Sequence, residues 1–356
     1  MRIIVDIGHP AHVHLFKNFI WQMEKRGHDI LITATEKDIT IDLLNNYGFD
    51  YIAMGSYGNS PARKMMNIPI MDFKMLRAVS GFKPDIFVGV APIRATHTSG
   101  LMRKPCIVFD DTEHSKWEHI LYIPFADVIC TPSCFKKNLG KKQIRYNGYH
   151  ELAYLHPNYL KPDPSVLDDL GLKEGDTFVI LRFVAWQASH DIGQHGFDML
   201  TKRRLVKEIE KYVRVLITSE SPLPTEFEKY KITAPPEKMH DLLYYATMYI
   251  GEGATMATEA AILGTPSVYT SSLSNTMGNF IELEQKYDLI YSFREPDKAI
   301  KKALELIQQP DLKKQWAKKR QRLLADKIDV TQFMVDLIEN YPQSFYRYKE
   351  ESRNRL

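Results

Sequence analysis

The chain has 356 residues, which corresponds to about two domains, and 44% of its residues are apolar. This composition excludes a disordered chain and a small disulfide-stapled fold. Lys and Arg number 47 against 44 Asp and Glu, so the net charge of +3 is too small to indicate a nucleic-acid partner. Cys106, Cys130 and Cys134 supply neither a four-cysteine zinc site nor an even disulfide set, which favours a reducing cytoplasm.

The first half of the sequence alternates short apolar runs with helical periodicity. Residues 2–7 predict a strand, and from Leu15 apolar positions recur at helical spacing until Gly27, a favoured helix stop. Further strands are predicted over 28–35, 85–90, 105–109 and 127–130. This alternation indicates a parallel sheet with helices on both faces.

A proline-rich polar stretch over 156–176 predicts a linker, and a second alternation follows it. Strands are predicted over 177–183, 213–219, 247–251 and 266–270, and helices over about 198–211, 239–247 and 256–263. We therefore expect an α/β fold of two doubly wound, Rossmann-like domains, 1–155 and 175–325, facing each other across a cleft. The last segment, 326–356, contains a helix with an apolar stripe, which is expected to cross back onto the first domain.

The loop after the first predicted strand contains Gly8, His9, His12 and His14. Ligands of doubly wound sheets collect at the carboxyl ends of strands, and N–H groups at the start of the next helix favour anions. Gly8 would let a phosphate or an acceptor approach the backbone closely. The histidines would act as a base or bind a metal; the alternative is that His9 and His14 only cap or pack the helix.

A second candidate segment is residues 251–269, where a strand ends in glycines and leads into a helix. Small residues at a helix N-terminus leave backbone N–H groups accessible to a diphosphate. In this segment the small residues are Gly253, Ala254 and Thr255. Glu259, expected on the first turn, would accept hydrogen bonds from a ribose diol. The alternative is tight helix–sheet packing with a solvated Glu259.

Residues 180–191 open the second domain with a strand and a loop that hold Arg182, Ser189, His190 and Asp191. The guanidinium of Arg182 matches a phosphate in charge and geometry. A structural pairing of Arg182 with a carboxylate is an equally good interpretation.

Residues 109–119 follow another apolar strand and hold Asp110, Asp111, Glu113 and His114. These groups are expected at the same edge of the first domain, where a base would sit. The competing interpretation is that Asp111 or Thr112 caps a helix that begins near Ser115.

Residues 62–77 mix large apolar side chains with basic residues, which is typical of peripheral contact with an anionic membrane and also of a core helix with a charged rim. Apolar runs in the chain are too short to span a bilayer. We therefore expect a cytoplasmic protein, with 62–77 as the candidate contact to the inner face of the membrane.

The segment 239–269 resembles a motif of GT-B glycosyltransferases, with the matching residues Glu259, Ala260, Gly264 and Pro266. It is similar to the N-acetylglucosaminyl transferases of peptidoglycan synthesis and to the non-hydrolysing UDP-N-acetylglucosamine 2-epimerases. His12 falls where those transferases have the histidine of a Gly-Gly-His-x-x-Pro loop, with Leu15 in place of the proline. The whole chain resembles an uncharacterised archaeal and bacterial family of predicted glycosyltransferases.

This resemblance implies a GT-B fold in which the second domain holds a nucleotide-diphosphate sugar such as a UDP-sugar. Glu259 would bind the ribose, Gly253, Ala254 and Thr255 would face the diphosphate, and Arg182 is placed like a diphosphate-binding arginine of the epimerases. The first domain would hold the acceptor, a lipid-linked or cell-envelope glycan precursor.

We predict sugar transfer without a metal or other cofactor. An imidazole titrates near neutrality, so His12 is the predicted general base, with Asp111 and Glu113 in reserve. The alternatives are a nucleotide-sugar epimerase or hydrolase, a binding module without turnover, and a metal-dependent amidohydrolase barrel whose metal pair would be His12 and His14.

Overall fold

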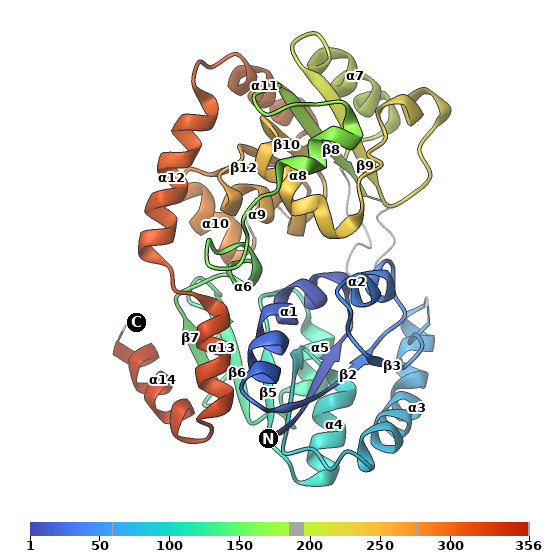
Figure 1. Cartoon of the computed structure of the whole chain (residues 1–356), viewed down its shortest axis with the longest axis vertical. Coiled ribbons are helices and arrows are strands. Elements are labelled where there is room, and N and C mark those ends of the chain that lie inside the picture. The colour runs from blue at the N-terminus through green and yellow to red at the C-terminus, as the bar shows by residue number, and fades with distance from the viewer. Residues whose placement is uncertain (59, 185–195, 273, 275, 355–356) are drawn as a thin grey trace. The chain divides into compact units, whose positions relative to one another are not determined.

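The computed structural model describes all residues except 59, 185–195, 273, 275 and 355–356. The chain forms two compact units (Figure 1). Unit 1 comprises Met1–Tyr154 and Ile328–Leu356, and unit 2 comprises Leu155–Lys327. Each unit contains one parallel sheet flanked by helices, so the predicted pair of doubly wound α/β sheets is confirmed.

Unit 1 is built on a seven-stranded sheet of order β3-β2-β1-β4-β5-β6-β7, in which every neighbouring pair is parallel. The strands are β1 (Arg2–Ile7), β2 (Asp29–Ala34), β3 (Tyr51–Ala53), β4 (Ile86–Val90), β5 (Cys106–Phe109), β6 (Val128–Pro132) and β7 (Gln143–Tyr146). The strand order reverses between β1 and β4, which places a ligand-binding crevice at the carboxyl end of β1 in sheets of this kind. The short β3 and β7 are the strands of this sheet that sequence periodicity missed.

The helices of unit 1 are α1 (Pro10–Lys25), α2 (Thr40–Asn46), α3 (Pro61–Ser80), α4 (Ile93–Met102), α5 (Lys116–Tyr122), α6 (Leu152–Leu155, across the unit boundary), α13 (Val330–Glu339) and α14 (Gln343–Asn354). Helix α1 starts at Pro10, five residues before the predicted start, because proline fits the first helical position and His9 caps the helix. His12 and His14 therefore lie on the helix and not in a loop.

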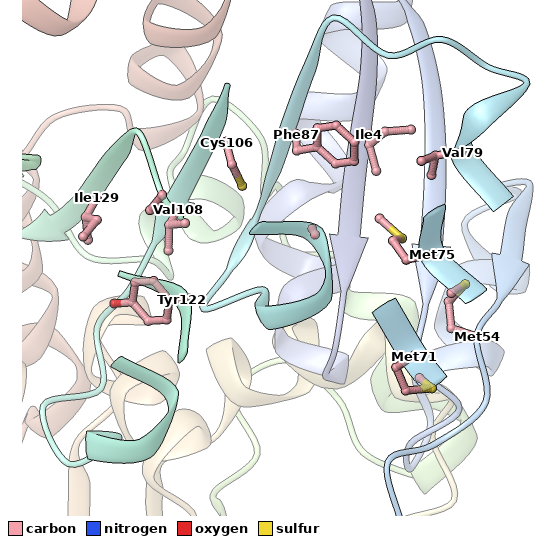
Figure 2. Close-up of a cluster of buried hydrophobic side chains, with 12 residues drawn as sticks. Ile4, Met54, Met71, Met75, Val79, Phe87, Cys106, Val108, Tyr122 and Ile129 are labelled. Carbon is pink, nitrogen blue, oxygen red and sulfur yellow. The ribbon is translucent and has the colours of Figure 1, made fainter. Parts of the chain in front are cut away.

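One face of this sheet is covered by α3, α4 and α5 (Figure 2). Ile4 and Phe87 of neighbouring strands lie against Met75 and Val79 of α3, and Tyr122 of α5 lies against Val108 (Figure 2). All of these side chains are fully buried. The inner sides of the three helices are thus fixed by burial of apolar surface.

Helix α13 returns to unit 1 and packs against α1. Its stripe is buried: Val330, Phe333, Met334, Leu337 and Ile338. At the rim, Gln332 donates to Gln22 at 2.7 Å and Arg26 pairs with Glu339 at 2.7 Å.

Unit 2 is built on a five-stranded parallel sheet of order β12-β11-β10-β8-β9. Its strands are β8 (Phe178–Phe183), β9 (Arg214–Ser219), β10 (Met248–Gly251), β11 (Ser267–Thr270) and β12 (Ile290–Phe293). Its α-helices are α7 (Met199–Ile209), α8 (Met239–Tyr245), α9 (Ala254–Leu263), α10 (Gly278–Gln285), α11 (Pro296–Ile307) and α12 (Leu312–Asp326), and its 3₁₀ helices are η1 (Pro164–Leu170), η2 (Thr225–Tyr230) and η3 (Pro236–Lys238). The proline-rich stretch belongs to unit 2, because η1 buries Val166 and Leu167 there.

Candidate functional site

In unit 1, three side chains near the carboxyl ends of β1, β5 and β7 lie close enough to influence one another electrostatically: His12 on the first turn of α1, Asp111 after β5, and His150 after β7. Nδ1 of His150 lies 3.2 Å from the Asp111 carboxylate. The backbone N–H of Gly8 donates to Nδ1 of His12 at 3.2 Å. When that ring is neutral, its proton therefore sits on Nε2, which makes His12 a donor in this arrangement.

His150 is a residue that the sequence analysis missed. The residue is 8% exposed, its ring packs near those of Phe109 and Tyr146, and its buried Nε2 atom has no hydrogen-bond partner among the described residues. A carboxylate on Nδ1 with a free Nε2 is the arrangement that orients an imidazole to accept a proton. Prediction of β7 would have placed His150 just beyond a strand end and marked it as a candidate.

The charges of this cluster shift its pKa values in opposite directions. Burial disfavours the ionised form of Asp111, but the charge and hydrogen bond of His150, with Thr112 and His12, lower its pKa to about 2. Burial likewise opposes a charge on His150, yet Asp111 raises the pKa of His150 above its ordinary value. Burial and the neighbouring His9 and His150 hold the pKa of His12 well below its ordinary value. At neutral pH, His12 is therefore the uncharged imidazole.

These shifts predict a pH dependence that Asp111→Asn removes. Because the pKa of His150 is raised, this residue stabilises folded unit 1 below pH 6.5, and that stabilisation is lost as the pH rises further. Because the pKa of Asp111 is lowered, this residue stabilises folded unit 1 above about pH 4, and that stabilisation is lost as the pH falls towards about 2. Carbon-13 NMR of labelled histidines should show His150 titrating above pH 6.5, and below that value in Asp111→Asn. Identical titration of His150 in both proteins would contradict the pairing.

The other predicted histidines of α1 serve the helix. Nδ1 of His9 accepts the backbone N–H of Ala11 at 3.2 Å and so caps α1. His14 is buried, lies 3.2 Å from the hydroxyl of Tyr47, and packs against the ring of Tyr154. The alternative interpretation, capping and packing, therefore describes the contacts of His9 and His14.

Of the acidic residues after β5, Asp111 is the one that the structure brings to His150. Asp110 accepts hydrogen bonds from His119 at 2.8 Å and Tyr122 at 2.5 Å. The buried Glu113 accepts the backbone N–H of Lys136 at 3.3 Å. His114 is exposed. The N-cap of α5 is Ser115, and neither Asp111 nor Thr112 caps that helix, so the capping interpretation was wrong.

In unit 2, the predicted Arg182 lies beside the start of α9. A Cβ atom on Gly253 would lie 3.1 Å from Cγ of Arg182, and one on Gly251 would lie 2.8 Å from the Arg182 carbonyl oxygen. A side chain at position 251 would therefore clash with the backbone of β8, whereas one at position 253 would push against the side chain of Arg182. The guanidinium donates to Thr218 at 3.0 Å and to the half-exposed Glu220 at 2.9 Å.

Helix α9 begins at Ala254, with Gly253 as an N-cap that supplies no side-chain hydrogen bond. Ala254 is partly buried and Thr255 is exposed. N–H groups of the first turn that lack a side-chain cap are the groups that bind anions at helix N-termini. The structure therefore brings Arg182, Gly253, Ala254 and Thr255 together.

Glu259 differs from its prediction in two respects. Because α9 starts at Ala254, Glu259 lies in the second turn and not in the first. The residue is only 5% exposed, and its Oε1 lies 3.0 Å from Nε2 of His240 on α8, so the alternative of a solvated carboxylate was also wrong. The other part of that alternative, tight packing of the helix, agrees with the structure, because the second half of α9 is buried.

Glu252 is a further residue that sequence reasoning missed. Its buried carboxylate accepts the backbone N–H groups of Val184 at 3.0 Å and Phe197 at 2.6 Å, and Lys202 lies 3.5 Å away. It thereby joins the two flanks of segment 185–195. Ser189, His190 and Asp191, which were candidates in that segment, lie outside the described residues.

Within the described part of the chain, no group of three or more His, Cys, Asp or Glu side chains is arranged to hold a metal ion. Two open sheets also exclude the barrel that the amidohydrolase alternative requires.

The comparisons with known proteins agree with this architecture. The model of the family described as "Protein of unknown function (DUF354)" matches residues 1–343. The chain belongs to this family. This DUF354 protein is 26% identical over 280 residues to the uncharacterized protein MJ0665 of Methanocaldococcus jannaschii, which covers 75% of this chain and 81% of that protein.

Two solved structures show the fold of this DUF354 protein. A Listeria monocytogenes protein assigned as a UDP-N-acetylglucosamine 2-epimerase matches with a TM-score of 0.68 and 14% identity, over 96% of each chain. The spinosyn rhamnosyltransferase SpnG complexed with thymidine diphosphate matches with a TM-score of 0.61 and 13% identity, over 96% of this chain and 100% of that one. The expected GT-B fold is confirmed.

Proposed function

We propose that this DUF354 protein transfers a sugar from a nucleotide-diphosphate donor to a hydroxyl acceptor. The observation that carries the proposal is the convergence of Arg182 with the N-terminus of α9 in unit 2. A cation beside uncapped N–H groups is suited to a diphosphate. The thymidine diphosphate bound to SpnG, which shares this fold, supports the same ligand class here.

On the donor side, the leaving diphosphate gains negative charge as the bond to the anomeric carbon breaks. Arg182 and the first-turn N–H groups at Gly253, Ala254 and Thr255 would stabilise that charge without moving, which is the most effective form of electrostatic catalysis. Glu259, positioned by His240, would accept the ribose hydroxyls.

On the acceptor side, the attacking hydroxyl must lose its proton as its oxygen bonds to the anomeric carbon. Two imidazoles in unit 1 are suited to accept that proton. His12 is neutral at pH 7, and His150 is oriented by Asp111, with no hydrogen bond to its Nε2 from the part of the chain that the structure describes. His12 would take the proton on Nδ1, after this atom has released its hydrogen bond from the backbone N–H of Gly8. The acceptor class we propose is a lipid-linked or cell-envelope glycan precursor.

A nucleotide-sugar epimerase on the same fold is the second candidate, because the match to the Listeria monocytogenes protein has the higher TM-score of the two structures described. An epimerase or hydrolase converts the donor without any acceptor. Product analysis after incubation with the sugar nucleotide alone therefore separates these activities from transfer.

The test is a thermal-shift panel with UDP, GDP, CDP and TDP and their sugars. A ligand at 100 times its dissociation constant stabilises the folded protein by about 2.7 kcal/mol. Glu259→Gln keeps an acceptor for His240 but loses the charge, and we expect about tenfold weaker nucleotide binding. Glu226→Gln, an exposed carboxylate of the same unit, is the matched control. Absence of any shift with every nucleotide would overturn the proposed donor site.

A further inference from the structure

Large apolar side chains are exposed on α3, α4 and α5 and just after α5, outside the proposed catalytic cluster. We call them the α3–α5 surface: Met65, Met66, Ile70, Phe73, Leu101, Trp117, Ile120 and Phe125. Their exposed fractions run from 47% for Phe125 to 75% for Met66. Over half of the exposed large apolar residues in the described chain are in this set, which is far more than scattered surface residues would give.

The three helices that carry this set are joined side by side on one face of the sheet. Nδ1 of His97 on α4 lies 2.7 Å from the carboxylate of Asp72 on α3, and its Nε2 lies 3.0 Å from the carbonyl oxygen of Leu121 on α5. The ring of Phe125 packs on His97 at 4.7 Å. Phe73 and Ile120 are the chain neighbours of Asp72 and Leu121, so the exposed apolar residues of the three helices lie close to one another.

Helix α3 has two distinct faces. Met71, Met75 and Val79 point into the core (Figure 2), whereas Met66, Ile70 and Phe73 form a second stripe, at helical spacing, that is exposed. Burial of the core stripe already fixes the helix. The exposed stripe leaves more than half of each of its side chains in contact with solvent, and its apolar character indicates contact with another apolar phase.

Basic residues accompany this surface: Arg63, Lys64, Lys74 and Arg77 on α3, Arg103 and Lys104 after α4, Lys116 on α5, and Lys136, Lys141 and Lys142 in the turn before β7. The ammonium of Lys142 bonds the carbonyl oxygens of Ile123 and Pro124, which brings that turn next to Phe125. Two acidic groups in the region are engaged, Asp72 with His97 and Asp127 with the N–H of Cys106. Glu118 on α5 is a further, partly buried carboxylate. The basic residues named here outnumber these acidic groups, so the surface is apolar and carries a net positive charge.

We propose that the α3–α5 surface binds the surface of an anionic phospholipid bilayer. Exposed methionine, tryptophan and phenylalanine side chains would enter the headgroup region, while lysine and arginine contact lipid phosphates. This surface extends the contact beyond segment 62–77 to α4 and α5. Among the described helices, none is long and apolar enough to cross a membrane. The inference stands independently of the proposed transfer reaction.

The test is sedimentation of the full chain with phosphatidylcholine vesicles with and without phosphatidylglycerol. We expect binding to the anionic vesicles that weakens at high salt, since each basic residue near such a surface contributes about fivefold. Met66→Ser/Ile70→Ser/Phe73→Ser and, separately, Lys74→Glu/Arg77→Glu should each lower the partition coefficient at least tenfold. Leu200→Ser and Lys301→Glu, exposed in unit 2, are matched controls that should leave it unchanged.

Trp117 gives a second readout that reports where the protein touches lipid. Its side chain is 68% exposed, so vesicles of brominated lipid should quench its fluorescence. Trp117→Phe should keep vesicle binding and lose most of that quenching. The proposal fails if neutral vesicles bind equally well, if the unit 2 controls weaken binding as much, or if vesicles do not bind and the α3–α5 variants instead abolish self-association of the protein.

Discussion

Asp111→Asn is expected to lower the turnover number about 100-fold or more while nucleotide affinity stays unchanged. Asp111 orients His150 through a 3.2 Å contact and places a negative charge beside His12, so both candidate bases depend on it. A positioned general base contributes about 10²–10⁴ in rate. Asparagine keeps the size of the side chain but removes the charge. Steady-state kinetics and nucleotide titration on the same preparations provide the measurement.

Glu113→Gln is the matched control for this variant. Glu113 is a buried carboxylate two residues further along the chain, and it accepts the backbone N–H of Lys136. Turnover in Glu113→Gln should stay within a few-fold of the unmodified protein. If Glu113→Gln abolished turnover and Asp111→Asn did not, the assignment of the proton-accepting cluster would be wrong.

Single histidine variants then identify which imidazole takes the proton. If His12→Ala keeps turnover and His150→Gln removes it, the base is the His150 that Asp111 holds; the reverse result assigns the role to His12. The acid limb of the pH profile of kcat/KM gives an independent readout, since it reports protonation of the base in the free enzyme.

Arg94→Ala is expected to lower the free energy of unfolding of unit 1 by about 3–5 kcal/mol, the usual effect of removing one partner of a buried ion pair. Arg94 is 1% exposed, and its guanidinium lies 2.6 Å from the carboxylate of Asp6, which is 5% exposed. Thr33 donates to the same carboxylate and Thr35 accepts from Arg94. The slowest-exchanging amides of β1 and β4, followed by hydrogen exchange in the full chain, measure the change.

The double variant Asp6→Ala/Arg94→Ala tests the origin of that loss. If the penalty comes from a buried charge without a partner, the double variant should be less destabilised than the two single variants added together. Strict additivity would show that Asp6 and Arg94 act on stability separately.

Local sequence predicted many of the strands and helices that have enough residues to show their period, although it missed β12, with four residues, and α4, with ten. Strands of four to six apolar residues such as β1, β4 and β8 were predicted, whereas β3 has three residues and β7 contains Gln143 and Arg145 among its four. The start of α1 was placed late because its first turn carries histidines where periodicity looks for apolar residues. The residue types in the first turn of a helix are determined by the hydrogen bonds that cap the helix, and not by burial of apolar side chains.

The site was predictable in residue type but not in partnership. Asp110, Asp111 and Glu113 are equivalent by spacing from β5, and only contacts with His119, Lys136 and His150 distinguish them. Those partners belong to other parts of the chain, so the local sequence pattern does not indicate which carboxylate contacts which partner. Glu259 and His240 are likewise brought together by the packing of α8 on α9.

Unit 1 is discontinuous, since it is completed by residues 328–356, and this has a consequence for synthesis on the ribosome. All of unit 2 emerges between the two parts of unit 1, so α1 leaves the ribosome long before the helix that packs against it. At typical elongation rates this delay is on the order of tens of seconds. During that interval unit 2 can complete its own sheet, while the nascent α1 keeps an apolar side available to chaperones until α13 arrives.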